Sequence, residues 1–446
     1  MKPDKFEPIS EEEINSVAEQ FKITDIEHAS IGEVLLMSSE LERRTGIPFI
    51  RMDQGSPGLP PCTIGLQAEK EALDMGVASL YPAADGIPPL KENLSEFIKA
   101  FINIDISPRC CIPTAGSVAG SFGSFIAATQ CSEGKDKVLF IDPGFPIQRS
   151  QLKILGIDYL QFDIYPYRGE KLEEKLESYL RRGDIAAIIY SNPNNPAWIC
   201  LEESELETIG RLATKYDTII LEDLAYFGMD FRRYLGRPWE PPYVPTVGRY
   251  TDNYIIMLSS SKIFSYAGQR MAAACISDKL FDRKFPALAS RYGGTGHFGS
   301  TFIASIMYMI TSGVTHTTQY GYAAMLKAAT EGRFDFVEET GEYAKRACRM
   351  KKIFTDNGFH IVYDYDVTLK VGDGFFFTIG YEGLSGGQLL KELLSYGVSS
   401  ISLDTTGSLE AGVRACSSRM REELYPVLEE RMRKFNEEHK SLKEKP

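Results

Sequence analysis

Short apolar runs alternate with stretches of helical periodicity through the middle of the chain. Each run is continuously apolar, which is typical of a strand covered on both faces of its sheet. The intervening stretches carry apolar residues on one face, as in EKLEEKLESYLRR (170–182), after which Gly183 ends the helix. The runs predicted to be strands are KVLFID (137–142), IAAIIYS (185–191), TIILED (218–223), YIIMLSS (254–260) and AAACIS (272–277).

Strands that alternate with helices indicate an α/β architecture with a mostly parallel sheet. Further helices are predicted from SVAGSFGSFIAATQC, after Gly116, and from LEESELETIGRLATKY (201–216). Since the strands are apolar throughout, we expect helices on both faces of the sheet. We therefore predict a large α/β/α domain of three layers.

The character of the chain changes after about residue 310. A long helical stretch rich in Glu, Lys and Arg covers roughly 318–357, and short strand-like runs and a charged final helix follow. This mixture predicts a smaller α+β domain, with which the N-terminal segment is expected to pack. The predicted division is 1–55 for the N-terminal segment, 56–315 for the large domain and 316–446 for the C-terminal small domain.

Length, charge and hydropathy narrow the possible functions. The net charge of -12, without a strong basic stretch to balance it, argues against nucleic acid or an anionic membrane as partner. The start, MKPDKFEPISEEEI, has no apolar signal core, and the most apolar run, TFIASIMYMI (301–310), is too short to span a bilayer. We expect a cytoplasmic chain.

The eight cysteines show no metal-binding pattern. None forms a CxxC pair, and the five histidines do not cluster with them. We therefore predict no metal site, and free buried thiols in a reducing cytosol.

Polar and aromatic side chains gather where the predicted strands end. Ligands of an open α/β sheet bind beyond the carboxyl ends of its strands, so these side chains are expected to face one site. A glycine turn that opens a helix lies earlier in the chain, at Gly116. The residues at the strand ends are Phe145, Asn195, Asp223, Tyr226, Ser259 and Lys262.

These side chains suit the cofactor pyridoxal 5'-phosphate. The cofactor needs an amine to form an imine, and Lys262 supplies one. Its ring nitrogen must stay protonated to act as an electron sink, which needs a buried carboxylate such as Asp223. Asn195 and Tyr226 are suitable donors to its 3-oxygen, and Phe145 is a flat partner for its ring.

A phosphate group would find its ligands at the helix that begins after Gly116. The backbone N–H groups of Ser117 and Val118 open this helix, and a helix N-terminus attracts anions. Arg270 and Ser259 would complete the phosphate site. Taken singly, Ser117 is equally well interpreted as a helix cap and Phe145 as a core residue.

Several motifs occur in order along roughly residues 50 to 420: YPAADG (81–86), GS (116–117), DPGFP (142–146), NPNNP (192–196), DLAY (223–226), SSSK (259–262) with Arg270, and Arg414. Each is weak alone, but their order and spacing form a strong joint signal. In these motifs the chain resembles fold-type I enzymes that depend on pyridoxal phosphate, specifically the class I/II aminotransferases.

The resemblance implies a role for each motif residue. Lys262 would bind the cofactor covalently, Asp223 would pair with the pyridinium nitrogen, and Tyr226 and Asn195 would donate to the 3-oxygen. Phe145 would stack on the ring.

The resemblance also implies that Ser117, Ser259 and Arg270 are phosphate ligands. Tyr81 would reach the phosphate of the neighbouring subunit's cofactor, which implies a homodimer. Arg414 would bind the α-carboxylate of the substrate, and Gly55, within DQGSPGLP (53–60), would line the substrate site together with Asn195.

The sequence departs from the family pattern after the asparagine turn. The family commonly continues with Pro-Thr-Gly, whereas here Asn195-Pro196 is followed by Ala197 and Trp198. We expect the loop to close differently and to cover the pocket with an indole. This departure leaves the substrate open.

The predicted function is an aminotransferase that moves an amino group between an L-amino acid and a 2-oxo acid with ping-pong kinetics. A pyridoxal-phosphate-dependent lyase, acting for example on a C–S bond, remains an alternative, as does a non-catalytic sensor that binds the cofactor. A dicarboxylate substrate would need a second arginine, for which Arg149 and Arg291 are candidates. His297, in GGTGHFGS, is a candidate substrate contact or a polar loop residue.

Overall fold

A computed structural model describes residues 6–444, and the chain forms two compact units. Unit 1 consists of the described parts of Met1–Gly58, Asn195–Ile199 and Gly341–Pro446. Unit 2 consists of Leu59–Asn194 and Cys200–Thr340. Residues 1–5, at the start of the predicted N-terminal segment, and residues 445–446 lie outside the described part of the chain.

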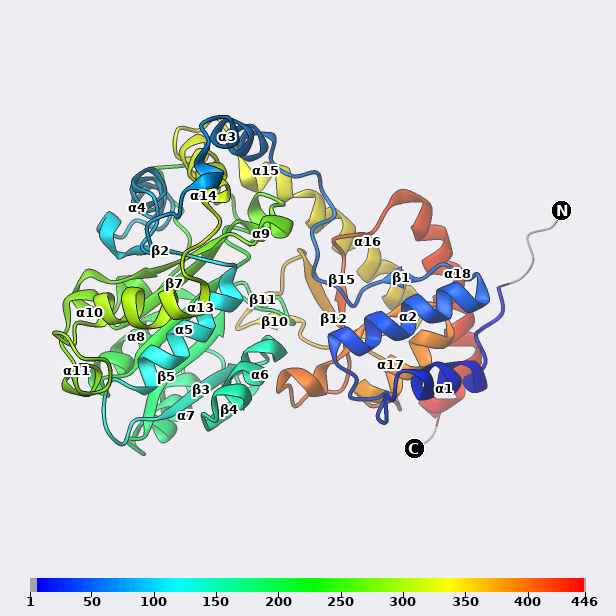
Figure 1. The fold of residues 1–446 in the computed structure, drawn as a ribbon. Helices are drawn as coiled ribbons and strands as arrows, with labels where there is room; N and C mark the ends of the chain where they lie inside the picture. Colours follow the sequence, from blue (N-terminus) through cyan, green and yellow to red (C-terminus); the bar gives the residue numbers. More distant parts are fainter. Residues whose placement is uncertain (1–5, 445–446) are drawn as a thin grey trace. The chain divides into compact units, whose positions relative to one another are not determined.

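Unit 2 is built on a seven-stranded sheet with the order β2-β8-β7-β6-β5-β3-β4 (Figure 1). The strands from β7 to β4 in this order pair in parallel, and β8 is antiparallel to both of its neighbours. The sheet is therefore mixed and mostly parallel, as predicted. Its strands are β2 (Cys111–Thr114), β3 (Lys137–Asp142), β4 (Tyr159–Asp163), β5 (Ile185–Ser191), β6 (Ile219–Leu224), β7 (Tyr254–Ser259) and β8 (Ala272–Ile276).

The sequence pattern identified five of these strands and missed β2 and β4. β2 has only four residues, and one of them is Pro113, which cannot donate to a strand ladder. β4 lies at the edge of the sheet, and its first three residues are exposed or half-buried. Neither strand forms the long apolar run that marks a strand buried on both faces.

Both faces of this sheet are buried. Consecutive residues of a strand point to opposite faces, and Ile188 and Ile189 of β5, like Ile255 and Ile256 of β7, are each at most 1% exposed. Helix α5 (Ser117–Thr129) packs against most of the strands, and α8 (Glu203–Lys215) packs against β6. The predicted three-layer α/β/α architecture is confirmed.

The remaining helices of unit 2 surround this core. The apolar run at 301–310 is helical and includes a π-helical turn, Phe302–Met307. Among residues 6–444, no helix is long and apolar enough to cross a membrane. These helices are α3 (Thr63–Asp74), α4 (Pro88–Ile102), α6 (Pro146–Leu155), α7 (Lys171–Leu180), α9 (Ser260–Ile263), α10 (Asp278–Asp282), α11 (Pro286–Tyr292), α12 (Phe298–Thr301), α13 (Tyr308–Thr311), α14 (His316–Thr330) and α15 (Phe336–Thr340).

The helical stretch predicted at roughly 318–357 is divided into three helices. The stretch forms α14, α15 and α16 (Glu342–Asp356). The chain turns after α14 at Gly332, whose φ of +70° favours glycine. Helix α14 packs on α3 and α4, so residues 316–340 group with unit 2, whereas α16 belongs to unit 1.

Unit 1 contains an antiparallel four-stranded sheet with the order β14-β15-β12-β9. A parallel pair, β1 with β13, and a hairpin, β10 with β11, accompany it. The strands are β1 (Ile50–Arg51), β9 (His360–Ile361), β10 (Tyr365–Asp366), β11 (Leu369–Lys370), β12 (Phe376–Gly380), β13 (Val398–Ser399), β14 (Ile401–Ser402) and β15 (Val413–Cys416). Its helices are α16, α1 (Glu11–Gln20), α2 (Ile31–Thr45), α17 (Gly386–Ser395) and α18 (Tyr425–His439).

A buried carboxyl group links three segments of unit 2. Glu222 of β6 is fully buried, and its side chain accepts hydrogen bonds from Tyr190 of β5 at 3.0 Å, from Thr246 and from the N–H of Val247 at 3.1 Å. Burial raises the pKa of Glu222 to about 7, although these hydrogen bonds act in the opposite direction.

Replacing Glu222 with Gln should change how the free energy of unfolding depends on pH. The folded protein releases this proton near pH 7, whereas the unfolded chain releases it near the ordinary pKa of 4.5. The folded state holds more protons between these values, so the group lowers stability as pH rises from 4.5 to 7, by about 3 kcal/mol. Urea unfolding at about pH 5 and about pH 8 should show a smaller loss of stability in E222Q than in the wild type.

Glu207→Gln is the matched control, because Glu207 is an exposed residue on α8. It should leave the pH dependence unchanged. The interpretation is contradicted if E222Q and the wild type lose the same free energy between the two pH values.

Candidate active site

The carboxyl ends of β6 and β7 bring Asp223 and Lys262 to the same edge of the sheet. The two strands are parallel neighbours, with Asp223 opposite Met257. Lys262 is the third residue of α9, which begins directly after β7. The positive charge of Lys262 contributes to lowering the pKa of Asp223. A carboxyl group and an amine therefore lie at the same edge of the sheet.

The carboxyl group of Asp223 lies in a dry environment. Burial raises its pKa to about 6. The backbone N–H of Ala225 donates to Oδ1 at 3.1 Å, Gln148 Nε2 donates to Oδ2 at 3.3 Å, and both of these bonds lower the pKa. Because the charged form of a buried acid lacks hydration, a cationic partner would stabilise it.

Gln148 is a residue of this site that the sequence analysis missed. It lies in the first turn of α6, three residues after Phe145, which caps that helix. Phe145 is half-buried. Residues three apart on a helix share a face. The position of Gln148, three residues after the predicted stacking residue Phe145, was therefore the sequence signal that could have identified it.

The N-terminus of α5 offers unpaired hydrogen-bond donors. Gly116 caps the helix with a φ of +77°. The first N–H groups of a helix, here those of Ser117 and Val118, have no partner within the helix. The buried hydroxyl of Ser117 has no hydrogen-bond partner among the described residues.

Arg270 lies against this helix end. A Cβ atom on Gly116 would overlap the Nη2 of Arg270. The guanidinium also donates through Nη1 to the carbonyl of Ala267 at 2.9 Å. The structure thus brings together Gly116, Ser117 and Arg270, which the sequence assigned to one phosphate site.

The loop from Lys262 to Arg270 is held at its middle by α3. Tyr266 and Gln269 both donate to the carboxylate of Glu69, the second at 3.3 Å. At its start, Ser259 caps α9 by accepting from the N–H of Ser261 at 3.2 Å. The loop therefore has a defined conformation.

The asparagine turn after β5 is braced by two of its amides. Asn192 Oδ1 accepts from the N–H of Leu201 at 3.1 Å, and Asn194 Nδ2 donates to the carbonyl of Pro143 at 2.7 Å. Tyr226 follows β6 and is 5% exposed. Tyr81, in contrast, is 93% exposed in the single chain.

Unit 1 holds Arg414 and Asn195 in direct contact. Arg414 lies on β15, is 2% exposed and donates through Nη1 to Asn195 Oδ1 at 3.1 Å. Its Nη2 donates to the backbone carbonyl of Asp53. Its guanidinium lies 4.5 Å from the ring centroid of Phe376. These contacts fix the direction of a buried cation.

The segment that contains Gly55 is anchored at both ends within unit 1. The buried carboxylate of Asp53 accepts from Arg51 Nε at 3.1 Å and from the hydroxyl of Ser399. On the other side of Gly55, the carbonyl of Ser56 accepts from the hydroxyl of Ser418, in the loop after β15. Asp53 was not among the site residues predicted from the sequence.

Three other candidates have different surroundings. Arg149, considered as a second arginine for a dicarboxylate, is ion-paired with Asp142 and lies over the ring of Phe140. Arg291 is exposed on α11. His297 lies 2.6 Å, through Nδ1, from the hydroxyl of Thr295 in the same loop.

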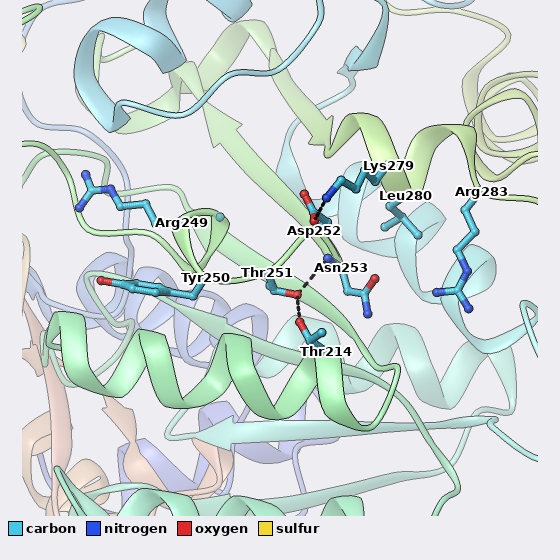
Figure 2. Close-up of a pocket in the computed structure, with 10 residues that line it drawn as sticks. Thr214, Arg249, Tyr250, Thr251, Asp252, Asn253, Lys279, Leu280 and Arg283 are labelled. Carbon is cyan, nitrogen blue, oxygen red and sulfur yellow. Dashed lines mark hydrogen bonds and ion pairs between the residues drawn. The ribbon is translucent and has the colours of Figure 1, made fainter.

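A pocket of about 510 Å³ lies at the amino end of β7, away from Lys262 (Figure 2). Its cations are paired with acids: Lys279 contacts Asp252 at 2.7 Å, and Arg283 contacts Asp217 at 2.5 Å. We assign no chemistry to it. Its lining residues are Thr214, Gly248, Arg249, Tyr250, Thr251, Asp252, Asn253, Lys279, Leu280 and Arg283.

The family described as aminotransferase class I and II matches residues 47–431. The chain belongs to this family. Class I and II aminotransferases use pyridoxal 5'-phosphate.

Curated aminotransferases are related to parts of the chain. The aspartate aminotransferase of Pyrococcus horikoshii is 28% identical over 254 residues, which cover 55% of this chain and 59% of that protein. The aspartate/prephenate aminotransferase of Thermus thermophilus is 24% identical over 234 residues, which cover 52% of this chain and 57% of that protein. The chain thus matches less than two thirds of the length of these relatives.

Solved aminotransferases share the fold over most of the chain. The alanine aminotransferase of Pyrococcus furiosus is similar with a TM-score of 0.73 and 20% identity, and the match covers 92% of this chain and 97% of that one. The aspartate aminotransferase of Thermus thermophilus with maleate is similar with a TM-score of 0.71 and 20% identity, over 91% and 96%. At these identities the likeness is one of fold.

The residues of unit 2 fit the cofactor of class I and II aminotransferases. A phosphate would satisfy the unpaired hydroxyl of Ser117 and the N–H groups of the helix end, and Arg270 would offset its charge. A protonated ring nitrogen would add a cationic partner for the buried carboxyl of Asp223.

Replacing Gly116 with Ala should weaken binding of pyridoxal phosphate. The added methyl group overlaps the guanidinium of Arg270, so that side chain must move away from the helix end. We expect the dissociation constant, measured by absorbance titration of cofactor-free protein, to rise by about tenfold or more.

Gly134→Ala is the matched control. Gly134 has nearly the same φ, +78°, but no atom lies near its added Cβ, so the variant carries the same backbone strain without the overlap. Equal cofactor affinities in the two variants would contradict the assignment of Arg270 to the phosphate.

Proposed function

We propose that this member of the family is a pyridoxal-phosphate-dependent aminotransferase. It moves an amino group between an L-amino acid and a 2-oxo acid by a ping-pong mechanism. The observation that carries the proposal is the placement of Lys262 beside the buried carboxyl of Asp223, at the adjacent ends of β7 and β6. Family membership supports the same reaction.

Most of the proposed cofactor-binding residues belong to unit 2. Lys262 would bind pyridoxal phosphate covalently, and Asp223 would keep the proton on its ring nitrogen. Tyr226 and Asn195 would donate to its 3-oxygen, and Phe145 would stack on its ring. The proposed phosphate ligands are Gly116, Ser117, Val118, Ser259, Arg270 and, from the neighbouring subunit, Tyr81.

When bound, the cofactor supplies an electron sink that stabilises the negative charge left when a proton leaves the substrate Cα. Lys262 would take this proton from the Cα and return it on the next step, as a general base and then a general acid. Asp223 is suited to its task because its carboxylate is buried and its two oxygens accept from Ala225 and Gln148. These bonds orient the carboxylate before any ligand arrives.

The proposed substrate site includes Arg414, Asn195 and Gly55. Arg414 is buried, and its guanidinium is oriented by an amide oxygen and a backbone carbonyl. A guanidinium of this kind binds a carboxylate through two parallel hydrogen bonds, which orients the substrate as well as holding it.

We further propose that unit 2 is the cofactor-binding domain and unit 1 the small domain of a cytoplasmic homodimer. Tyr81 contributes to the partner's site in this arrangement. Exposed apolar side chains near Tyr81 support an interface: Leu80 is 62% exposed and Met75 is 61% exposed. A surface of this kind is typical of a protein contact.

Lys262→Ala should abolish transamination while leaving the fold intact. Without the amine, both covalent attachment of the cofactor and proton transfer at Cα are lost, so the rate should fall by about 10³-fold or more. The measurement is a screen of amino donors and 2-oxo acceptors with identification of products. Borohydride reduction of the wild type should leave a cofactor label on the peptide with residue 262.

Lys279→Ala is the matched control, since Lys279 is an exposed lysine at the other end of the sheet region. It should transaminate normally. A wild type that releases ammonia and pyruvate from cysteine would be a lyase, and one that shows only an absorbance change would be a sensor. Either result, or transamination by K262A, contradicts the proposal.

Two inactive variants should restore activity in a mixed dimer. Tyr81→Ala damages the partner's site and Lys262→Ala damages the chain's own site, so a heterodimer keeps one intact site. With random pairing, half of the dimers are mixed and each has one intact site of two. Co-expression should therefore recover roughly a quarter of the activity of the same amount of wild-type protein. A monomer in sedimentation experiments, or mixed dimers without activity, would rule out a shared site.

A further inference from the structure

Trp198 occupies a backbone conformation that suits glycine. Its φ is +64°, in the left-handed region, where a residue other than glycine costs roughly 1–2 kcal/mol. Its side chain is nevertheless 1% exposed, among the largest fully buried side chains of the described chain. Contacts of the indole must therefore outweigh the backbone strain.

The indole packs tightly against Gly374, which lies two residues before β12. A Cβ atom on Gly374 would overlap the six-membered ring and the Nε1 of Trp198, so only glycine allows this approach. The ring of Phe376, two residues later, meets the indole edge-on, with centroids 6.3 Å apart and planes at 71°. Such aromatic pairs are worth about 0.5–1.5 kcal/mol beyond their buried area.

Phe376 connects Trp198 with Arg414, because its ring contacts both side chains. The guanidinium lies 4.5 Å from the centroid of the Phe376 ring, and Phe376 is fully buried. A cation over an aromatic face is attracted to the ring, and the attraction is stronger in a dry environment. The position of the phenyl ring, set in part by Trp198, therefore limits where the guanidinium can lie.

The segment 195–199 contacts Arg414 at a second point. Asn195, three residues before Trp198, accepts a hydrogen bond from Arg414 Nη1 at 3.1 Å. Within unit 1, Trp198 therefore contacts Phe376, and Phe376 contacts the guanidinium of Arg414. The guanidinium in turn contacts Asn195, in the same segment as Trp198.

We propose that Trp198 is a positioning residue that sets the geometry of the Asn195–Arg414 pair for binding a substrate carboxylate. This inference rests on the proposed function for the role of Arg414. The indole itself binds nothing in this scheme. It fixes the segment 195–199 and the ring of Phe376, and these fix the amide oxygen and the guanidinium.

The test is Trp198→Gly in the full-length chain loaded with pyridoxal phosphate. Glycine relieves the backbone strain and removes the packing, so a purely conformational role predicts no loss. We expect KM for the amino donor found in the screen, and the dissociation constant of propionate measured by NMR titration, each to rise by about tenfold. The kcat at saturating donor and the cofactor affinity should stay within about threefold of the wild type, since only uniform binding is lost.

Trp239→Gly is a closely matched control. Trp239 is the second tryptophan, it also has a left-handed φ, +69°, and it lies in unit 2. This variant should leave KM, kcat and propionate binding unchanged. If W198G raises KM and the propionate constant by less than about threefold, or if kcat and cofactor affinity fall as much as KM rises, the proposal is overturned.

If W198G does not fold, Gly374→Ala tests the positioning role of Trp198 instead. It keeps the indole but displaces it, so KM and the propionate constant should rise without a change in kcat, and an unchanged KM overturns the proposal. Arg414→Ala separates this inference from the proposed function, because it should abolish propionate binding. A wild type that turns over no donor contradicts the proposed function, whereas an active wild type with an unaffected W198G contradicts only the role of Trp198.

Discussion

The burial of one carboxyl group at the end of β6 is the constraint on which the site depends. Asp223 has lost its water, and desolvation makes its charge unfavourable unless a cation is present. The parallel pairing of β6 with β7 places Lys262 close enough to help, and donors from Ala225 and Gln148 hold the two oxygens in place. Because the negative charge of Asp223 is unfavourable without a nearby cation, the site favours a ligand that carries a positive charge.

Unit 1 uses the complementary arrangement. Here the buried charge is the guanidinium of Arg414, which donates to an amide oxygen and a backbone carbonyl. The backbone carbonyl of Asp53 accepts from Arg414, whereas its carboxylate accepts from Arg51 and Ser399. The proposed substrate carboxylate would add a negatively charged partner, which favours a buried cation.

Much of this architecture could be predicted from the sequence, because long apolar strands leave a clear pattern. β3 and β5 begin and end at the predicted residues. β2 and β4 could not be found in this way, since one is too short and the other is partly exposed. The first break within the predicted helical stretch lies at Gly332, which a helical pattern tolerates until its φ is known.

The site was predictable where residues lie at strand ends and not where they arrive from elsewhere. Asp223 lies at the end of β6 and Lys262 just after β7, and the sequence identifies both strands, so their place at one edge follows from the sheet. Gln148 and Asp53 act through side chains whose direction depends on packing. The contact between Trp198 and Phe376 joins residues far apart in the sequence, and no local pattern indicates it.

The two tryptophans of the chain are divided between the units, with Trp198 sealed in unit 1 and Trp239 half-exposed in unit 2. Because indole emission depends on contact with water, the fluorescence spectra of the two residues are expected to be separable without any added dye. A single denaturation series can therefore report whether the units unfold together or one after the other.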